Sequence, residues 1–83
     1  MDKLNNDNRV RLTKINQEDN KYRFYTIAIT KNLFNEWSVL REWGRIGQAG
    51  QTKIDWCENL EQARDFVEKK QREKVRRGYV IHL

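Results

Sequence analysis

The sequence has 83 residues, a length that allows one domain with one modest core and leaves no room for a separate catalytic domain. Hydrophobic residues make up 37% of the chain, which excludes a disordered protein, and no apolar run approaches the ~20 residues of a membrane span. The single cysteine, Cys57, excludes an internal disulfide and is typical of a reducing compartment. Because the chain begins with methionine and lacks the apolar core of a signal peptide, we expect a complete, cytoplasmic protein.

The positive charge is concentrated in one segment. The net charge is +5, from 17 lysines and arginines against 12 acidic residues. Residues 69–77 hold six cations and one anion, which leaves eleven of each elsewhere, so this segment carries the whole excess. Cations at a helix C-terminus offset the helix dipole, but that effect needs fewer cations than are present here. The pattern favours an anionic partner, with nucleic acid first and an acidic membrane surface second.

The first part of the chain predicts a polar terminus and a strand. Residues 1–8 are polar and asparagine-rich, which predicts a flexible N-terminus. Residues 9–16 alternate between apolar and polar side chains, but the phase shifts at Ile15, which predicts an irregularity near Lys14. Residues 17–21 are polar and predict a turn.

Three further strands follow at short intervals. Residues 22–30 give the clearest strand, because Tyr25, Ile27 and Ile29 share one face and β-branched and aromatic residues dominate. A second long strand is predicted over residues 37–46 and a third over 51–57, joined by a glycine-rich connection at 47–50. Short connections between consecutive strands predict an antiparallel meander.

Four large apolar residues between and within these strands are expected to contact the core. Leu33 and Phe34, in the turn at residues 31–36, are predicted to fold back onto the sheet. Trp37 and Trp56 are predicted to be core residues, because a tryptophan in a strand is more often buried than exposed.

After residue 58 the apolar period changes from 2 to 3.6, which predicts one helix. Asn59 is the expected N-cap, with Gln62 completing a capping-box-like pair, and Gly78 is the expected residue just past the C-terminal end. The apolar tail 79–83 is predicted to dock on the body, and the helix has an apolar stripe of Leu60, Ala63, Phe66 and Val67. The prediction is a single α+β domain over residues 9–83, with about four antiparallel strands and one amphipathic helix on one face.

An ordered set of motifs resembles the WGR domain family over roughly residues 9–79. The matching segments are Lys21-Tyr22-Arg23-Phe24-Tyr25, Trp43-Gly44-Arg45, Ile46-Gly47, Gly50-Gln51-Thr52 and Arg77-Gly78-Tyr79. The three-letter motif is weak by itself, whereas the ordered set is specific. The family is best known from DNA-dependent poly(ADP-ribose) polymerases, and short free-standing relatives occur in bacteria.

The resemblance implies a fold and a function. It implies an antiparallel sheet with one packed helix that binds DNA near a strand break, with Trp43 against the sugar of a terminal nucleotide. In the polymerases the motif arginine, here Arg45, helps to pass that contact to neighbouring domains. The sequence shows no catalytic, zinc-finger or helical domain of the polymerases, so their activation role does not carry over.

The segment 43–51 supplies the first half of a predicted nucleic-acid site. Trp43 offers an aromatic face and Arg45 a planar cation, and both point to the same side of a regular strand. The alternative for Arg45 is an ion pair with Glu42 or Asp55, or a structural contact to the helix. Gly47 and Gly50 serve the turn or let backbone approach a phosphate, and the alternative for Gln51 is to cap that turn. The nucleic-acid candidates in this segment besides Trp43 and Arg45 are Gly44, Gly47 and Gln51.

The helix supplies the second half. Lys70 and Lys74 fall on the same stripe as the apolar residues, so we expect them at the rim of the sheet, where snorkelling is the alternative to phosphate contact. Arg77 completes the candidate set at the basic end. If this rim adjoins residues 43–51, the two halves form one concave basic patch.

No catalytic site, metal site or cofactor is predicted. His82 and Cys57 lack partners at the spacing of zinc ligands or of a nucleophile and its base, and no phosphate-binding loop is present. The leading hypothesis is a monomeric DNA-binding module, nucleoid-associated, that prefers duplex ends or breaks. The alternative is a protein-interaction adaptor that uses the same loop. A third hypothesis is RNA binding through the sheet face, with Tyr22 and Phe24 as stacking platforms.

Overall fold

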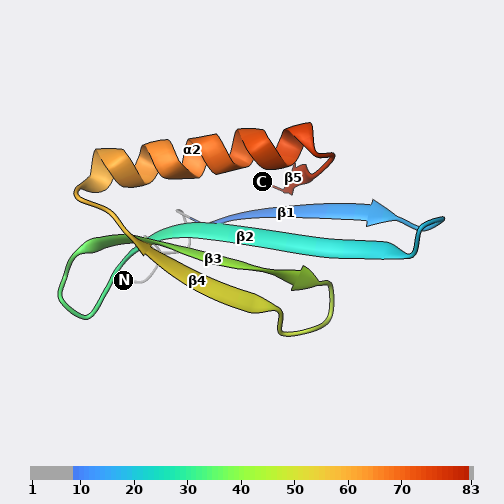
Figure 1. Cartoon of the computed structure of the whole chain (residues 1–83), viewed down its shortest axis with the longest axis horizontal. Coiled ribbons are helices and arrows are strands. Elements are labelled where there is room, and N and C mark those ends of the chain that lie inside the picture. Colours follow the sequence, from blue (N-terminus) through green and yellow to red (C-terminus); the bar gives the residue numbers. More distant parts are fainter. Residues whose placement is uncertain (1–8, 83) are drawn as a thin grey trace.

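A computed structural model describes residues 9–82, so the predicted flexible N-terminus at 1–8 lies outside the described residues. One antiparallel sheet has the strand order β4-β3-β2-β1-β5, and helix α2 lies across one of its faces (Figure 1). This confirms the predicted α+β fold and adds a fifth strand, because the tail pairs with β1 instead of only docking. The elements are β1 (Arg9–Asn16), β2 (Lys21–Lys31), β3 (Trp37–Arg45), β4 (Gln51–Trp56), α2 (Leu60–Arg76) and β5 (Val80–His82).

Strand β1 is regular along its whole length, so the predicted irregularity near Lys14 is wrong. The register with β2 continues without a break to the pair of Asn16 with Lys21. Ile15 simply points to the face opposite the helix, where its side chain is 57% exposed. An apolar residue on the uncovered face interrupts the apolar–polar alternation in the sequence, and this interruption looks the same as the one that a β-bulge would cause.

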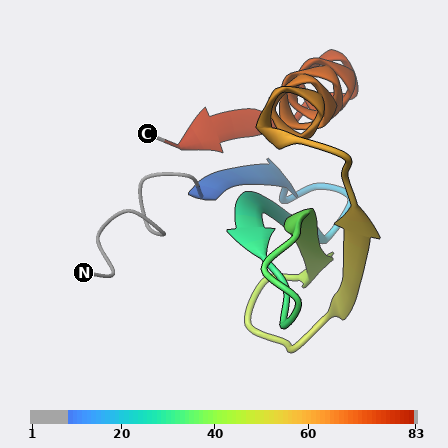
Figure 2. The same ribbon diagram turned by 90° about the vertical axis from the view of Figure 1, so that its left-hand side faces the viewer.

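The core lies between the helix and one face of the sheet. Figure 2 shows the sheet curving around the helix, so that β4 and β5 flank it on either side. The side chains that fill this space come from alternate strand positions and from the apolar stripe of α2, as the sequence periods predict. Its buried members are Leu12, Tyr25, Ile27, Ile29, Val39, Cys57, Ala63 and Val67.

Both helix ends follow the predicted capping pattern. The Asn59 side chain accepts a hydrogen bond from the backbone N–H of Gln62 at 2.8 Å, and the Gln62 side chain accepts one from the N–H of Glu58. At the other end Gly78 has a positive φ of 98°, which turns the chain back toward the sheet. Tyr79 N–H then bonds the Lys74 carbonyl in a Schellman arrangement, which places β5 beside β1.

Four large apolar residues were predicted to contact the core, and for three of them, Leu33, Phe34 and Trp56, the prediction is wrong. Leu33 is 99% exposed and Phe34 is 80% exposed, because their turn extends away from the sheet. Trp56 is 60% exposed, because it points to the sheet face that no helix covers within residues 9–82. Trp37 does pack against the core as a half-buried residue. Helix α2 covers only one face of the sheet, so apolar alternation on edge strand β4 does not lead to burial.

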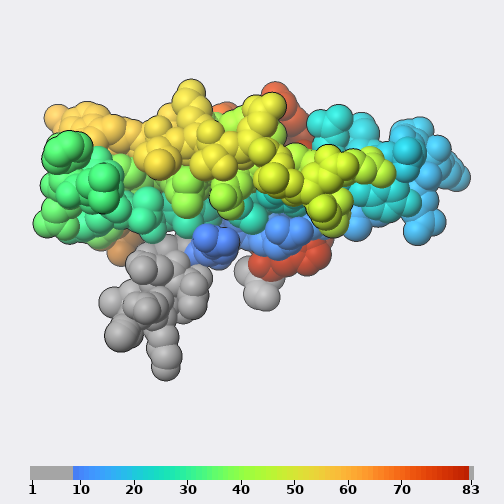
Figure 3. Space-filling model, turned by 90° about the horizontal axis from the view of Figure 1, so that it is seen from below, coloured from blue at the N-terminus to red at the C-terminus, as the bar shows by residue number. Residues whose placement is uncertain are grey.

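The uncovered face, which we call the open face, is turned toward the viewer in Figure 3. Ala28 and Ser38 are buried on this face, while Ile54 and Trp56 of edge strand β4 stay exposed. Within residues 9–82 no helix is long and apolar enough to cross a membrane.

Candidate functional site

The segment Trp43–Gln51, called here the Trp43 loop, is a tight connection between β3 and β4. It is tied to the neighbouring strand by a hydrogen bond from the Ile46 N–H to the Tyr22 carbonyl at 2.8 Å. Gly47 and Gly50 have φ values of 91° and 76°, a backbone region that other residues rarely adopt. Both glycines therefore serve the turn, as one of the two sequence interpretations proposed.

Gly44 has a packing reason to be glycine. A Cβ atom at Gly44 would lie 2.7 Å from the Gly50 Cα, and one at Gly50 would collide with the Trp43 carbonyl oxygen. Phe24, the cross-strand partner of Gly44, lies within van der Waals reach of both positions. The Arg11 guanidinium lies 5.2 Å from the centroid of the Phe24 ring.

Arg45 is exposed and is held by the β1–β2 turn. Its guanidinium donates to the Asn20 backbone carbonyl at 3.2 Å and to the Asn20 side-chain oxygen at 3.3 Å. It also lies 5.2 Å from the centroid of the Tyr22 ring. The Asn20 backbone has a φ of 53°, a turn geometry that asparagine tolerates. The predicted alternatives for Arg45 are wrong, because the ion pair with Asp55 belongs to Arg41 instead.

Trp43 lies between two hollows. It packs against the core, with its ring 6.4 Å from that of Tyr25, yet it keeps part of its surface exposed. On one side is the end pocket of about 530 Å³, which also includes Arg45, Gln48, Gly50 and Gln51. On the other side is the basic cleft of about 200 Å³, formed by Tyr25, Arg41, Trp43, Lys70 and Lys74.

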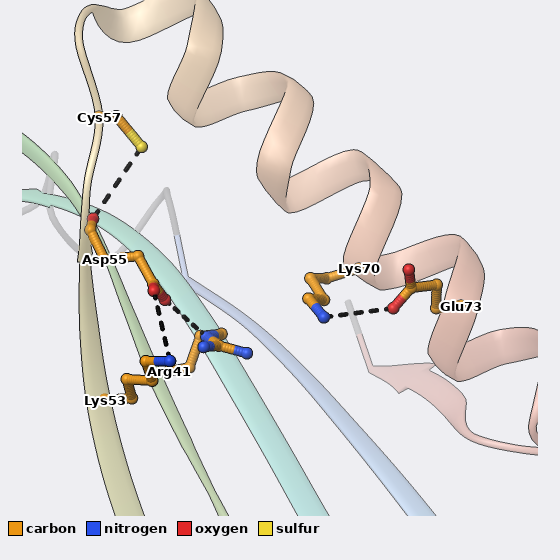
Figure 4. A network of polar contacts seen from close by, with 6 residues as sticks. All are labelled: Arg41, Lys53, Asp55, Cys57, Lys70 and Glu73. Carbon is orange, nitrogen blue, oxygen red and sulfur yellow. Dashed lines mark hydrogen bonds and ion pairs between the residues drawn. The ribbon is translucent and has the colours of Figure 1, made fainter.

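The basic cleft joins the two halves of the predicted site. Lys74 reaches down from α2 so that its Nζ lies 4.5 Å from the centroid of the Tyr25 ring. Figure 4 shows Lys70 on the sheet side of α2, paired with Glu73 at 3.3 Å, and Arg41 on β3, paired with Asp55 at 2.9 Å. The sequence-based prediction that Lys70 and Lys74 point toward the rim of the sheet agrees with this geometry.

The electrostatics of the cleft favour an anion. Burial lowers the pKa of Lys74, and the neighbouring cations Arg77 and Lys70 lower it further. Burial opposes the charge of Arg41, but Tyr25 and Asp55 outweigh it and raise the pKa of Arg41. An anion in the cleft would relieve the mutual repulsion of these cations.

One residue that lines the cleft also carries a buried polar group. The Tyr25 hydroxyl is buried and has no hydrogen-bond partner among residues 9–82, although its residue lines the cleft. A buried hydroxyl without a partner carries a desolvation cost of about 1–3 kcal/mol. The groups that the cleft offers to an oxyanion are therefore its three cations, Arg41, Lys70 and Lys74.

The other predicted site residues lie in different places. Gln51 lines the end pocket, whereas Gly47 is exposed on the loop and lines neither hollow. Arg77 caps α2, and its carbonyl accepts a hydrogen bond from Lys14 at 2.6 Å, so its backbone holds the helix end to β1. Its side chain is outside both hollows.

Sequence reasoning missed Arg41 and Tyr25 as members of the site. Arg41 shares a strand face with Val39 and Trp43, both of which point toward the helix. A cation at a core-facing position next to an aromatic residue was the available signal. Tyr25 was assigned to the core, which is correct, but the residue also lines the cleft.

Cys57 and His82 take no part in this site. Cys57 is buried, and its pKa is raised by burial and by the nearby charge of Asp55. His82 contacts the Thr13 hydroxyl at 2.6 Å on β1. In the described part of the chain no group of three or more His, Cys, Asp or Glu side chains could hold a metal ion.

An open antiparallel sheet with one helix, carrying an aromatic and cationic surface where the two meet, defines a small recognition domain. The chain matches the model of the WGR domain over residues 8–82, and it belongs to that family. This confirms the resemblance drawn from the motifs. WGR domains, which occur in poly(ADP-ribose) polymerases, are generally nucleic-acid-binding modules.

Two relatives are similar to this chain over most of its length. The human protein mono-ADP-ribosyltransferase PARP3 is 35% identical over 68 residues, which is 82% of this chain and 13% of that protein. The uncharacterized protein y4dW of Sinorhizobium fredii (strain NBRC 101917 / NGR234) is 34% identical over 71 residues, which is 86% of this chain and 35% of that protein. The chain thus spans about an eighth and about a third of these two relatives.

Proposed function

We propose that this domain binds DNA through the Trp43 loop and the basic cleft, that it prefers duplex ends or strand breaks, and that it binds without catalysis. The observation that carries the proposal is the position of Trp43, which forms a wall shared by the end pocket and the basic cleft. A ligand that crosses this tryptophan contacts an aromatic face and the cations on both sides.

The cations suit a phosphate backbone. Lys70, Lys74 and Arg41 line the basic cleft, and Arg45 lines the end pocket. Lys70 and Arg41 already have acidic neighbours, while Lys74 contacts only aromatic rings among the interactions described, with its Nζ also 5.3 Å from the Tyr79 ring. Lys74 is therefore the cation with most to gain from a phosphate.

The preference for ends follows from the aromatic wall. Inside a continuous duplex the bases are stacked and the sugars are flanked by their neighbours, so a flat ring finds a free sugar or base face only at a terminus. Stacking of an aromatic side chain on a base contributes about 1–3 kcal/mol. Phosphate contacts alone would bind ends and closed duplexes alike.

The test is a titration of a short blunt duplex, followed by fluorescence anisotropy at several salt concentrations. With about three phosphates contacted, we expect the logarithm of the affinity to fall against the logarithm of the salt concentration with a slope of about −3. Competition at equal nucleotide concentration then compares linear fragments with closed circular DNA, and the linear fragments should displace the probe more strongly.

A matched pair of double variants isolates the cleft. Lys70→Ala with Lys74→Ala should reduce the salt slope by about 2, because it removes two phosphate contacts. Lys69→Ala with Arg76→Ala removes the same charge from exposed positions of the same helix and should change the slope less. Absence of binding at low salt contradicts DNA binding, and equal competition by closed circles contradicts only the end preference. Capture of a protein that survives nuclease treatment would support the adaptor alternative.

A further inference from the structure

Strand β4 forms an edge of the sheet, because among the described residues it pairs only with β3. It is six residues long, whereas the opposite edge strand β5 has only three. Two large apolar side chains on β4, Ile54 and Trp56, are each 60% exposed on the open face. Exposed edge strands with apolar side chains are templates for pairing with another strand.

The hydrogen-bond phase of β4 shows which residues are free to pair. The Cys57 N–H donates to the Trp37 carbonyl at 2.9 Å, and inward bonds alternate along an antiparallel ladder. Continuing this alternation, Asp55 and Lys53 bond to β3, opposite Val39 and Arg41. The backbone groups that point away from the sheet are then those of Thr52, Ile54 and Trp56.

We propose that β4 pairs with β4 of a second copy of this chain, in antiparallel register about a two-fold axis at Ile54. In this register Ile54 faces Ile54 of the second copy, and Thr52 faces Trp56. All three outward-facing residues then meet outward-facing partners, so each pair exchanges two backbone hydrogen bonds. A two-fold axis is the commonest symmetry of protein dimers.

The charges on β4 select this register. A symmetric pairing centred on Lys53 or on Asp55 would also match the free backbone groups, but it would place two like charges opposite each other. Centred on Ile54, Lys53 faces Asp55 of the second copy at both ends. Lys53 has the freedom to do so, because its side chain is 60% exposed and lies 3.9 Å from Asp55 of its own chain. Opposite charges at facing positions stabilise a sheet by about 0.2–1 kcal/mol.

The open face adds apolar contacts to this pairing. Beside Ile54 is a hollow of about 480 Å³ that also includes Leu40 and the exposed turn residues Leu33 and Phe34. The Ser38 hydroxyl at this hollow is buried and has no hydrogen-bond partner within residues 9–82. Two copies joined at β4 would carry one continuous apolar strip across the axis.

The proposed dimer is compatible with the Trp43 loop being free. The Trp43 loop ends at Gln51, three residues before Ile54 on β4. In the dimer the two loops therefore lie at opposite ends of the paired strands, with the two Gln51 residues about 20 Å apart along the strand direction. The proposal does not rest on DNA binding, and it is tested without DNA.

The test is sedimentation equilibrium of the whole chain from roughly 10 μM to 1 mM, a range suited to a small interface. The mass should rise with concentration from 10.1 kDa toward twice that value. Ile54→Lys should weaken dimerisation about tenfold or more, because it places two lysines at the axis. Val80→Lys is the matched control: Val80 is an equally exposed residue, 61%, on the other edge strand, and its variant should dimerise like the wild type.

A second variant covers the case in which Ile54→Lys fails to fold. Lys53→Glu places a carboxylate opposite Asp55 of the second copy at an exposed position and should also weaken the dimer. A monomeric mass up to 1 mM would overturn the proposal, as would a dimer that resists both β4 variants or is weakened by Val80→Lys. Weakening by the β4 variants, with protection of the Ile54 amide from hydrogen exchange only at high concentration, would support it.

Discussion

The two faces of the sheet are built by the same alternation of side chains but carry different surfaces. The helix-covered face holds the core. Next to Trp43 it also has the basic cleft, which is lined by the three cations Arg41, Lys70 and Lys74. The open face has no helix among the described residues, and it leaves Ile54 and Trp56 exposed. Each face also carries one buried hydroxyl without a partner in residues 9–82, Tyr25 on the first and Ser38 on the second.

The difference between the two faces suits two different kinds of ligand. Under helix α2 the cations Arg41, Lys70 and Lys74 lie near aromatic rings, whose faces attract a positive charge. These cations can bind an anion. On the uncovered face Ile54 and Trp56 expose large apolar side chains, which suit a protein surface. One face therefore fits the proposed DNA contact and the other the proposed contact with a second copy.

The largest expected difference between the faces concerns stability. Ile27 on the helix-covered face is fully buried, whereas Ile54 on the open face is 60% exposed. Ile27→Ala should lower the free energy of unfolding by about 2–5 kcal/mol, because it leaves a cavity in the core. Ile54→Ala should change it by about 0.5 kcal/mol or less. Urea denaturation at low protein concentration measures both, and equal losses would contradict the assignment of the core to one face.

The next difference concerns the two tryptophans in DNA binding. Trp43→Ala should weaken binding to a short duplex by about 1–3 kcal/mol, which is roughly 5- to 150-fold, because it removes the proposed stacking surface. Trp56→Ala removes an equally large ring from the open face and should leave the affinity within about twofold. Anisotropy titrations give both values, with thermal unfolding to establish that each variant is folded. A larger effect at Trp56 would move the proposed site to the open face.

The smallest expected effect concerns pH. The folded-state pKa of Lys74 lies below its ordinary value of 10.5, so between these two values the unfolded chain binds more protons and folding stability rises with pH. Below the folded-state pKa the cost of the buried charge is fully present. Lys74→Met should therefore stabilise the protein at neutral pH, by about 1 kcal/mol or less, and the gain should shrink toward pH 10.5. Chemical denaturation of the wild type and the variant at neutral pH and at pH 10.5 measures the two free energies of unfolding. A gain in stability that does not change with pH would contradict the assignment of the effect to the Lys74 charge.

Local patterns were enough to predict the strands, the helix and its ends. Asn59, Gln62 and Gly78 act within a few residues of their own position, so their roles depend little on the rest of the fold. The burial of individual apolar residues depends on what covers each face. The errors at Trp56, Leu33 and Phe34 all arise there, because the sequence does not show which side of the sheet the single helix covers.

Individual residues of the candidate site could be predicted from the sequence, but the way they come together in the fold could not. The phase of the helix indicated that Lys70 and Lys74 point toward the sheet, and the motif indicated Trp43. That Trp43 lies against both a pocket and the cleft depends on the β3–β4 pairing and on the path of α2 over it. Arg41 was missed because its ion pair with Asp55 joins two strands whose register is a property of the folded sheet.

The pairing of β5 with β1 has a consequence for the order of folding. The pairings among strands β1 to β4 join strands that follow one another in the sequence, so each of these strands can pair soon after the one before it. The contact between Thr13 and His82 instead spans 69 residues. Closing a loop of that length costs about 2.5 kcal/mol more in chain entropy than closing a four-residue turn. We expect the last strand to join late, after the helix has formed the turn at Gly78 that aims the chain at β1.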